Sequence, residues 1–120
     1  MVHYVDRLII EMLNKGEYVV DIKHGRIFSV RRGRGSFRQL KGQIRRGYCR
    51  IDIRTKNLRI CAAAHRIVWI ARHRDLIPED LVVDHINGDR LDNRIENLEL
   101  ITHQENLKKR RFRGDFDREE

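Results

Sequence analysis

The sequence predicts an α+β fold, in which N-terminal antiparallel β-hairpins and short helices precede a C-terminal strand–loop–strand–helix unit. Three observations support this prediction. Apolar residues recur at helical spacing around residues 5–14 and 65–74. Short runs of alternating apolar and polar residues, separated by turn residues, indicate β-hairpins. Thr102 and Glu105 have the spacing of a capping box, which marks the start of a last helix.

The N-terminal part begins with a predicted helix over residues 5–14 that ends before Gly16. Its apolar positions have helical spacing and comprise Val5, Leu8, Ile9, Met12 and Leu13. Residues 18–22 and 26–30 are strand-like, and His24-Gly25 between them is a plausible hairpin turn. These elements predict a helix followed by a first hairpin.

Residues 31–46, RRGRGSFRQLKGQIRR, interrupt this pattern with glycines, few large apolar residues and seven positive charges. We expect an exposed loop there. Cys49, Ile51 and Ile53 then alternate with polar residues, which predicts a strand, and a turn at residues 55–57 leads to another strand over residues 58–62. The apolar face of residues 65–74 predicts a helix, and Pro78 separates it from the next strand.

The 120 residues are expected to form a single domain: residues 1–64 with the first helix and the hairpins, 65–113 with a helix and the strand–loop–strand–helix unit, and 114–120 as a charged tail. Two cysteines at this spacing do not indicate a structural zinc site. The sequence has no apolar run long enough to span a bilayer and no signal-peptide pattern. An intracellular, membrane-free setting is therefore expected.

The formal net charge of +8 favours a polyanionic partner such as DNA, and residues 1–64 are expected to help bind it.

Residues that can do chemistry are concentrated after residue 80. Asp84-His85 ends a short apolar run over residues 81–83, and Asn87-Gly88 begins a polar loop. Leu98 and Leu100 suit a second strand, and Asn106 lies in the first turn of the capped helix. This arrangement aims a carboxylate, an imidazole and an amide at a common point. The two oxygen donors suit a hard divalent cation and the histidine can transfer a proton, which indicates metal-assisted hydrolysis of a phosphodiester.

This segment resembles the HNH nucleases of the ββα-metal superfamily, in particular the phage and homing-endonuclease type with a DH…N…N pattern. The resemblance covers about residues 65–110 and includes the upstream helix at His65–Trp69 followed by Ile77-Pro78. The residues that match the motif are Asp84-His85, Ile86–Asp89, Leu91–Asn93, Glu96–Leu98 and Asn106.

The resemblance implies a role for each site residue. His85 is the expected general base that takes a proton from the attacking water, and Asp84 and Asn106 are the expected ligands of one metal ion. Asn97 corresponds to the middle asparagine, which ties the loop together and orients His85. Many family members have a histidine where this chain has Asn106, so the harder donor set favours Mg²⁺ or Mn²⁺. His103, three residues before Asn106, is a further candidate for a phosphate contact or for protonation of the leaving group.

Double-stranded DNA is the expected partner, bound by a monomer or weak dimer that nicks the DNA or cuts both strands. The expected phosphate contacts are two basic clusters: Arg31, Arg32, Arg34, Arg38, Arg45 and Arg46, and Lys108, Lys109, Arg110 and Arg111. If the protein is phage-encoded, it would act in the cytoplasm of a bacterial host.

Other interpretations of these features stay open. The main alternative is a noncatalytic DNA-binding protein that retains the nuclease fold. An RNA-directed nuclease or nuclease toxin is a more distant one. The basic clusters can also be explained as ordinary solvent-exposed surface that makes no DNA contact. The Asn- and Asp-rich loop lacks the full pattern of a calcium-binding loop.

Overall fold

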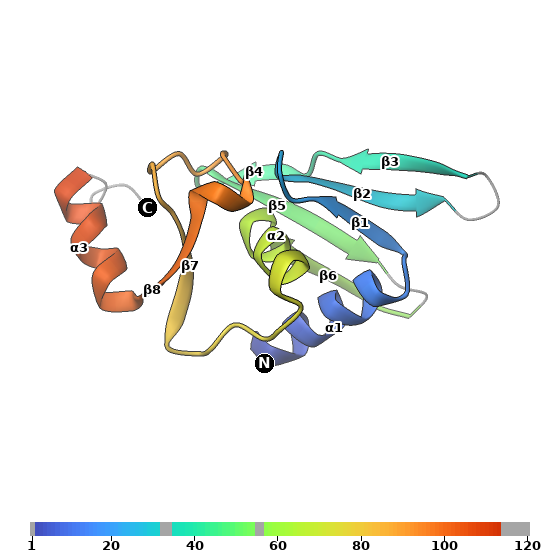
Figure 1. The fold of residues 1–120 in the computed structure, drawn as a ribbon, viewed down its shortest axis with the longest axis horizontal. Helices are drawn as coiled ribbons and strands as arrows, with labels where there is room; N and C mark the ends of the chain where they lie inside the picture. The colour runs from blue at the N-terminus through green and yellow to red at the C-terminus, as the bar shows by residue number, and fades with distance from the viewer. Residues whose placement is uncertain (1, 32–34, 55–56, 114–120) are drawn as a thin grey trace.

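The computed structural model describes residues 2–31, 35–54 and 57–113 and confirms the α+β class (Figure 1). The molecule is elongated, with extents of 49 × 25 × 24 Å. Helix α3 lies at one end and the β2–β3 hairpin at the other. The elements are α1 (Val2–Asn14), β1 (Tyr18–Asp21), β2 (Arg26–Arg31), β3 (Ser36–Leu40), β4 (Gln43–Arg45), β5 (Tyr48–Arg54), β6 (Arg59–Ala63), α2 (Ala64–His73), β7 (Leu81–His85), a 3₁₀ turn η1 (Ile95–Asn97), β8 (Leu98–Thr102) and α3 (His103–Arg113).

The described strands form three small antiparallel sheets, ordered β1-β2-β3, β4-β5-β6 and β7-β8. Helix α2 lies at the centre and contacts strands of all three. Its Val68 and Ile70 are completely buried, and α1 packs beside it. Alternation along β5 directs Ile51 and Ile53 into this core and Asp52 between them outward. The site hairpin β7–β8 is therefore attached to the body of the molecule through α2.

A buried ion pair joins α1 to α2. The carboxylate of Asp6, which is fully buried, accepts hydrogen bonds from Nε and Nη2 of Arg66 at 2.7 and 2.8 Å. It also accepts the backbone N–H of Ile77 at 3.2 Å. Both carboxylate oxygens are thus satisfied, which a buried charge requires. The bond to Ile77 additionally fixes the segment that leads into β7.

The prediction of a loop over residues 31–46 is wrong, because strands β3 and β4 occupy residues 36–40 and 43–45. Strand β3 pairs with β2 from Ile27↔Leu40 to Arg31↔Ser36, and β4 pairs with β5. Backbone hydrogen bonds make these strands, whereas their side chains stay exposed except for the half-buried Leu40. The alternation of buried and exposed residues that signals a strand is therefore missing from this sequence. Its exposure was predicted correctly.

Several local predictions are confirmed with shifted ends. The first helix begins at Val2 rather than residue 5, and the helix after β6 spans Ala64–His73. The capping box at Thr102 is present: Thr102 Oγ1 accepts the Glu105 N–H at 3.0 Å, and Glu105 Oε1 accepts the Thr102 N–H at 2.9 Å. Within the described part of the chain, no helix combines the length and apolarity needed to cross a membrane.

Candidate functional site

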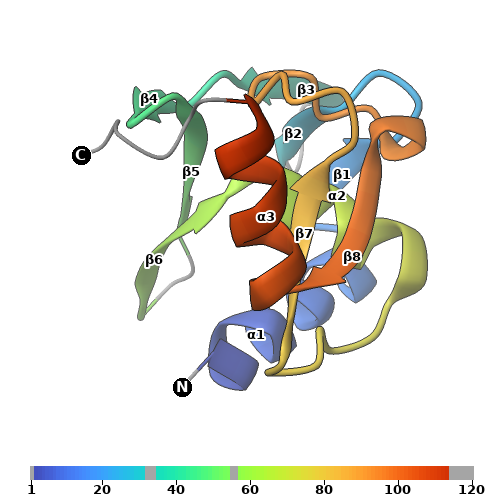
Figure 2. The same ribbon diagram turned by 90° about the vertical axis from the view of Figure 1, so that its left-hand side faces the viewer.

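The hairpin β7–β8 carries the predicted site residues. Its register runs from Leu81↔Thr102 to His85↔Leu98, so Asp84 and His85 stand where the hairpin opens into its loop. Helix α3 begins directly after β8 and lies across this hairpin (Figure 2). The strand–loop–strand–helix unit expected from the sequence is therefore present.

A cavity of about 880 Å³ lies between this unit and the outer face of the β4–β6 sheet. Asp84, His85 and Asn106 all border it, as the sequence predicted. His103 is exposed and is not among the residues that line the cavity. The complete lining comprises Val5, Arg45, Arg46, Tyr48, Arg50, Cys61, Ala62, Ala63, His65, Arg66, Val82, Val83, Asp84, His85 and Asn106.

The imidazole of His85 is held by an amide that the sequence interpretation left without a role. Its Nε2 atom lies 2.8 Å from Oδ1 of Asn93, and both residues are buried. An amide oxygen only accepts hydrogen bonds, so this contact favours the tautomer with the proton on Nε2. In that tautomer Nδ1 is the basic nitrogen of the ring.

The side chain of Asn97 ties the loop together through three hydrogen bonds. Its Oδ1 accepts the Asn87 N–H at 3.0 Å, and its Nδ2 donates to Asn87 Oδ1 and to the Asp92 carbonyl. Asp92 in turn receives two hydrogen bonds from the Arg94 guanidinium, and these hold the pKa of its carboxyl well below the usual range, at about 2. The loop is thus a closed hydrogen-bonded network around Asn97.

The rings of His65 and Tyr48 also lie beside His85, a position that the sequence did not indicate for either of them. The His65 ring centroid is 4.7 Å from that of His85, and Tyr48 lies 5.4 Å from His65 and 6.0 Å from His85. The Arg90 guanidinium covers the Tyr48 ring at 4.9 Å. Burial, together with the nearby His85, Arg66 and Arg50, lowers the pKa of His65 to about 3. His65 is therefore neutral at physiological pH.

The carboxylate of Asp84 is paired with a lysine of α3. Lys109 Nζ donates to Asp84 Oδ2 and, at 2.9 Å, to Glu99 Oε2. Burial opposes the charge on this ammonium, but the hydrogen bonds to the two carboxylates raise its pKa above the usual range. Glu99 was not a predicted site residue, although the hairpin register places it directly opposite Asp84. Glu99 follows Leu98 in the predicted second strand, and its pairing with Asp84 became visible only in the register of the two strands.

The residues present fit a weakly held divalent cation. Asp84 and Asn106 border one cavity and supply a carboxylate and an amide oxygen, which hard cations prefer. The Asp84 carboxylate already binds a positive charge, the Lys109 ammonium. Among the described residues, no group of three or more His, Cys, Asp or Glu side chains is arranged to hold a metal. A cation held by these two side chains alone would take its remaining ligands from water or phosphate.

The predicted DNA-contacting residues fall into different environments. Arg45 and Arg46 line the cavity, whereas Arg38 and Lys108 are exposed elsewhere. Lys109 is engaged with the two carboxylates. Arg32 and Arg34 lie outside the described residues, as do the side chains of Arg31, Arg110 and Arg111.

Arginines of the outer sheet face supply charge that the sequence analysis missed. Arg50 borders both the main cavity and a second one of about 540 Å³, which Arg45 and Arg59 also line. The two-residue turn at Arg46-Gly47, with φ of 54° and 84°, closes the β4–β5 hairpin beside the cavity. Arg59 is paired with Asp52 at 3.0 Å, so the positive charge beside the main cavity comes chiefly from Arg45, Arg46 and Arg50.

The hairpin, the helix beside it and the Asp-His-Asn constellation are the features that the resemblance to ββα-metal nucleases implies. Residues 62–108 match the model of a family described as HNH endonuclease. This match supports the resemblance to HNH endonucleases inferred from the motif.

Two similar proteins are consistent with this resemblance. An uncharacterized HNH endonuclease, L247, of Acanthamoeba polyphaga mimivirus is 52% identical over 44 residues, which are 36% of this chain and 11% of that protein. A solved structure described as DNA binding and cleavage by the HNH homing endonuclease I-HmuI matches with a TM-score of 0.66 and 32% identity. That match covers 83% of this chain and 55% of the other. The chain thus spans about half of the structural relative and a small part of the viral one.

Proposed function

We propose that the chain is a metal-dependent DNA endonuclease that hydrolyses phosphodiester bonds at the cavity bordered by Asp84, His85 and Asn106. The observation that carries this proposal is the convergence of these side chains with Arg45 and Arg50 in a single cavity. A base, cation ligands and phosphate-binding cations are the parts that phosphodiester hydrolysis needs. The relative I-HmuI, described as binding and cleaving DNA, supports DNA as the substrate.

His85 acts as the general base in this proposal. When its Nε2–H donates to Asn93, Nδ1 is the basic nitrogen of the ring and takes the proton of an attacking water. The ring is confined between Asn93 and the ring of His65, so it loses little freedom when the water is activated. Asn97 contributes by keeping the loop in the shape that presents Asn93.

Asp84 and Asn106 hold one Mg²⁺ or Mn²⁺, and this ion offsets charge on the phosphate and on the departing oxygen when it is bound. Arg45, Arg46 and Arg50 contact phosphates on either side of the scissile bond. His103 is exposed and stays a lesser candidate for contact with the leaving-group side. One such site per chain suits a monomer that nicks one strand.

A supercoiled-plasmid assay tests the proposal. The purified protein should convert supercoiled to nicked DNA with Mg²⁺ or Mn²⁺ and should be inactive in excess EDTA. His85→Ala should lower the rate by about 10²–10⁴ while DNA affinity is retained. His73→Ala is a matched control, because His73 is exposed and does not line the cavity. DNA binding without cleavage under all metal conditions would favour the noncatalytic alternative.

A further inference from the structure

One ammonium group bridges two opposed carboxylates at the edge of the cavity. Asp84 and Glu99 are direct cross-strand partners in the β7–β8 hairpin, and Lys109 of α3 donates to both. Like charges placed directly opposite on antiparallel strands destabilise the pairing. The Lys109 ammonium offsets this repulsion and also attaches α3 to the hairpin.

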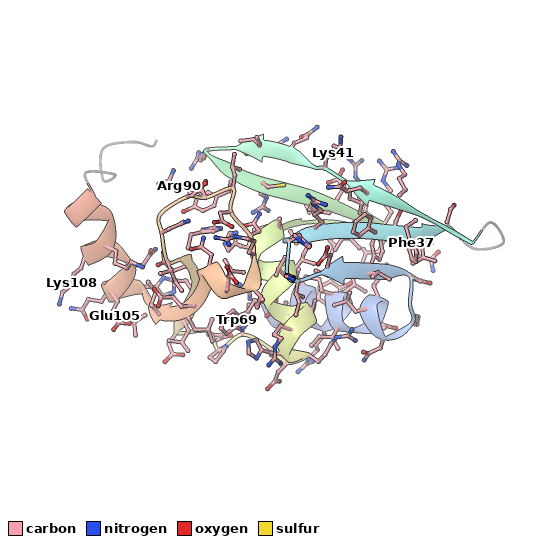
Figure 3. The ribbon with its side chains drawn as sticks, turned by 45° about the horizontal axis from the view of Figure 1, so that its top comes forward. Phe37, Lys41, Trp69, Arg90, Glu105 and Lys108 are labelled. Carbon is pink, nitrogen blue, oxygen red and sulfur yellow. The ribbon has the colours of Figure 1, made fainter. Side chains whose placement is uncertain are left out.

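Lys109 is partly shielded from water, whereas the neighbouring Lys108 is exposed. Its side chain is 30% exposed and the Asp84 side chain only 9%, so the pair is largely shielded from water. Lys108, the preceding residue of the same helix, is exposed and projects away from the hairpin (Figure 3). Shielding strengthens an ion pair relative to a fully solvated one.

We propose that Lys109 is an internal cation that competes with the divalent metal for Asp84. When the metal binds, Glu99 keeps the Lys109 ammonium beside the site. This inference rests on the proposed function, in which Asp84 is a metal ligand. An ammonium and a divalent cation cannot both lie against one carboxylate without strong repulsion, since their Coulomb energy grows as the distance shortens. Metal binding therefore breaks the contact of Lys109 with Asp84.

The competition has two consequences. The metal-free protein keeps its hairpin and α3 in place without an ion, because Lys109 neutralises both carboxylates. The affinity for metal is lower than the donor atoms alone would give, since part of the binding free energy is used to displace the ammonium.

Mn²⁺ binding in the absence of DNA tests the proposal directly. Free Mn²⁺ is measured by electron paramagnetic resonance during titration of wild type, Lys109→Met and Lys108→Met. Methionine keeps the apolar stem and removes the charge, and the two variants have equal net charge. Lys109→Met should bind Mn²⁺ at least about 5-fold more tightly than wild type, the lower end of typical coupling between linked binding events. Lys108→Met should bind like wild type.

Equal affinities of wild type and Lys109→Met would overturn the proposal, as would undetectable binding in both. The plasmid assay separates these failures. If cleavage depends on Mn²⁺ but wild type and Lys109→Met bind Mn²⁺ equally, only the competition is refuted. If neither Mn²⁺ binding nor cleavage is detected, the proposed function is refuted as well.

A second measurement needs no variant, in case Lys109→Met does not fold. Lysine acylation of the wild-type protein is followed by mass spectrometry with and without saturating Mn²⁺. The ratio of Lys109 to Lys108 labelling should rise with Mn²⁺, because the ammonium loses its most shielded partner. An unchanged ratio would overturn the proposal.

Discussion

The Nε2 atom of His85 lies 2.8 Å from the Oδ1 atom of Asn93, and this contact holds the imidazole at the end of β7. The two residues are eight positions apart and meet only because the loop between them folds back over the end of β7. Both are buried, so the contact is shielded from competing water.

Removal of the Asn93 amide should slow cleavage without unfolding the protein. In Asn93→Ala, His85 loses the acceptor that holds its orientation, and the rate should fall by about 10–100-fold, as is usual for groups that orient a site residue. Asn93→Asp keeps an oxygen that accepts the His85 hydrogen bond, so its cleavage rate should fall less than that of Asn93→Ala. Single-turnover cleavage rates and thermal melting of the purified variants check this. A folded Asn93→Ala protein with wild-type rate would refute the role of Asn93.

The turn of the β1–β2 hairpin supports the same loop, and a pair of glycine variants tests this. A Cβ at Gly25, where φ is +70°, would lie 2.5 Å from the Asn93 carbonyl carbon and 2.6 Å from its oxygen. Gly16 has a similar φ of +76° but open space around it. Gly16→Ala should therefore lower the free energy of unfolding by only about 1–2 kcal/mol, the strain of a left-handed backbone at a residue other than glycine.

Gly25→Ala should cost a further ~1–3 kcal/mol, because backbone atoms must move apart. It should also reduce cleavage, since the displaced residue is Asn93. Urea unfolding gives the free energies and the plasmid assay gives the rates. Equal destabilisation by the two substitutions would show that the loop does not depend on the turn.

His65 should make the protein sensitive to acid. Its pKa falls from an ordinary 6.5 to about 3 on folding, first because of burial and then because of His85, Arg66 and Arg50. Between these values the unfolded chain binds a proton that the folded one does not. Stability conferred by the neutral ring is thus complete above about pH 6.5 and is lost as the pH falls toward 3.

The expected slope from this one residue is at most about 1.4 kcal/mol per pH unit. Urea unfolding of wild type and His65→Phe at pH 7.5, 6 and 5 checks it, because phenylalanine keeps a ring but does not titrate. The variant should lose less stability on acidification. His73→Phe, at an exposed position, should follow wild type. Parallel pH profiles of wild type and His65→Phe would contradict the prediction.

The arginines that border the cavity should dominate the salt dependence of DNA binding. Each phosphate contact contributes roughly −0.9 to the slope of log affinity against log salt on duplex DNA. Replacing Arg45 and Arg50 by alanine should therefore flatten the slope by about 2 units. Replacing Arg7 and Arg72, which are exposed and do not line the cavity, removes the same charge and should change the slope much less. Equal slopes for the two double variants would favour nonspecific attraction over defined contacts.

Local signals in the sequence were sufficient for the predicted site residues. The apolar run before Asp84, the turn at Asn87-Gly88 and the capping box at Thr102 each act over a few residues. Together they determine a hairpin followed by a helix. This unit brings Asp84, His85 and Asn106 together, whereas the β4–β6 sheet and α2 supply the other side of the cavity that these residues border.

Contacts between distant segments decided the remaining features. The pairing of β3 with β2 depends on backbone hydrogen bonds that leave no pattern in exposed side chains, so residues 36–40 were assigned to a loop. The rings of Tyr48 and His65 come to His85 only through the packing of the β4–β6 sheet and α2. Neither relationship is encoded by spacing along the chain.

The sequence by itself determined the chemical groups of the site, because short-range turn, strand and capping preferences position them. Tertiary structure alone decided which of their neighbours orient and neutralise them. Asn93 holds His85, and Lys109 occupies Asp84. Each contact depends on how a loop or helix closes over the hairpin, and closure is governed by burial and charge balance in three dimensions rather than by local preference.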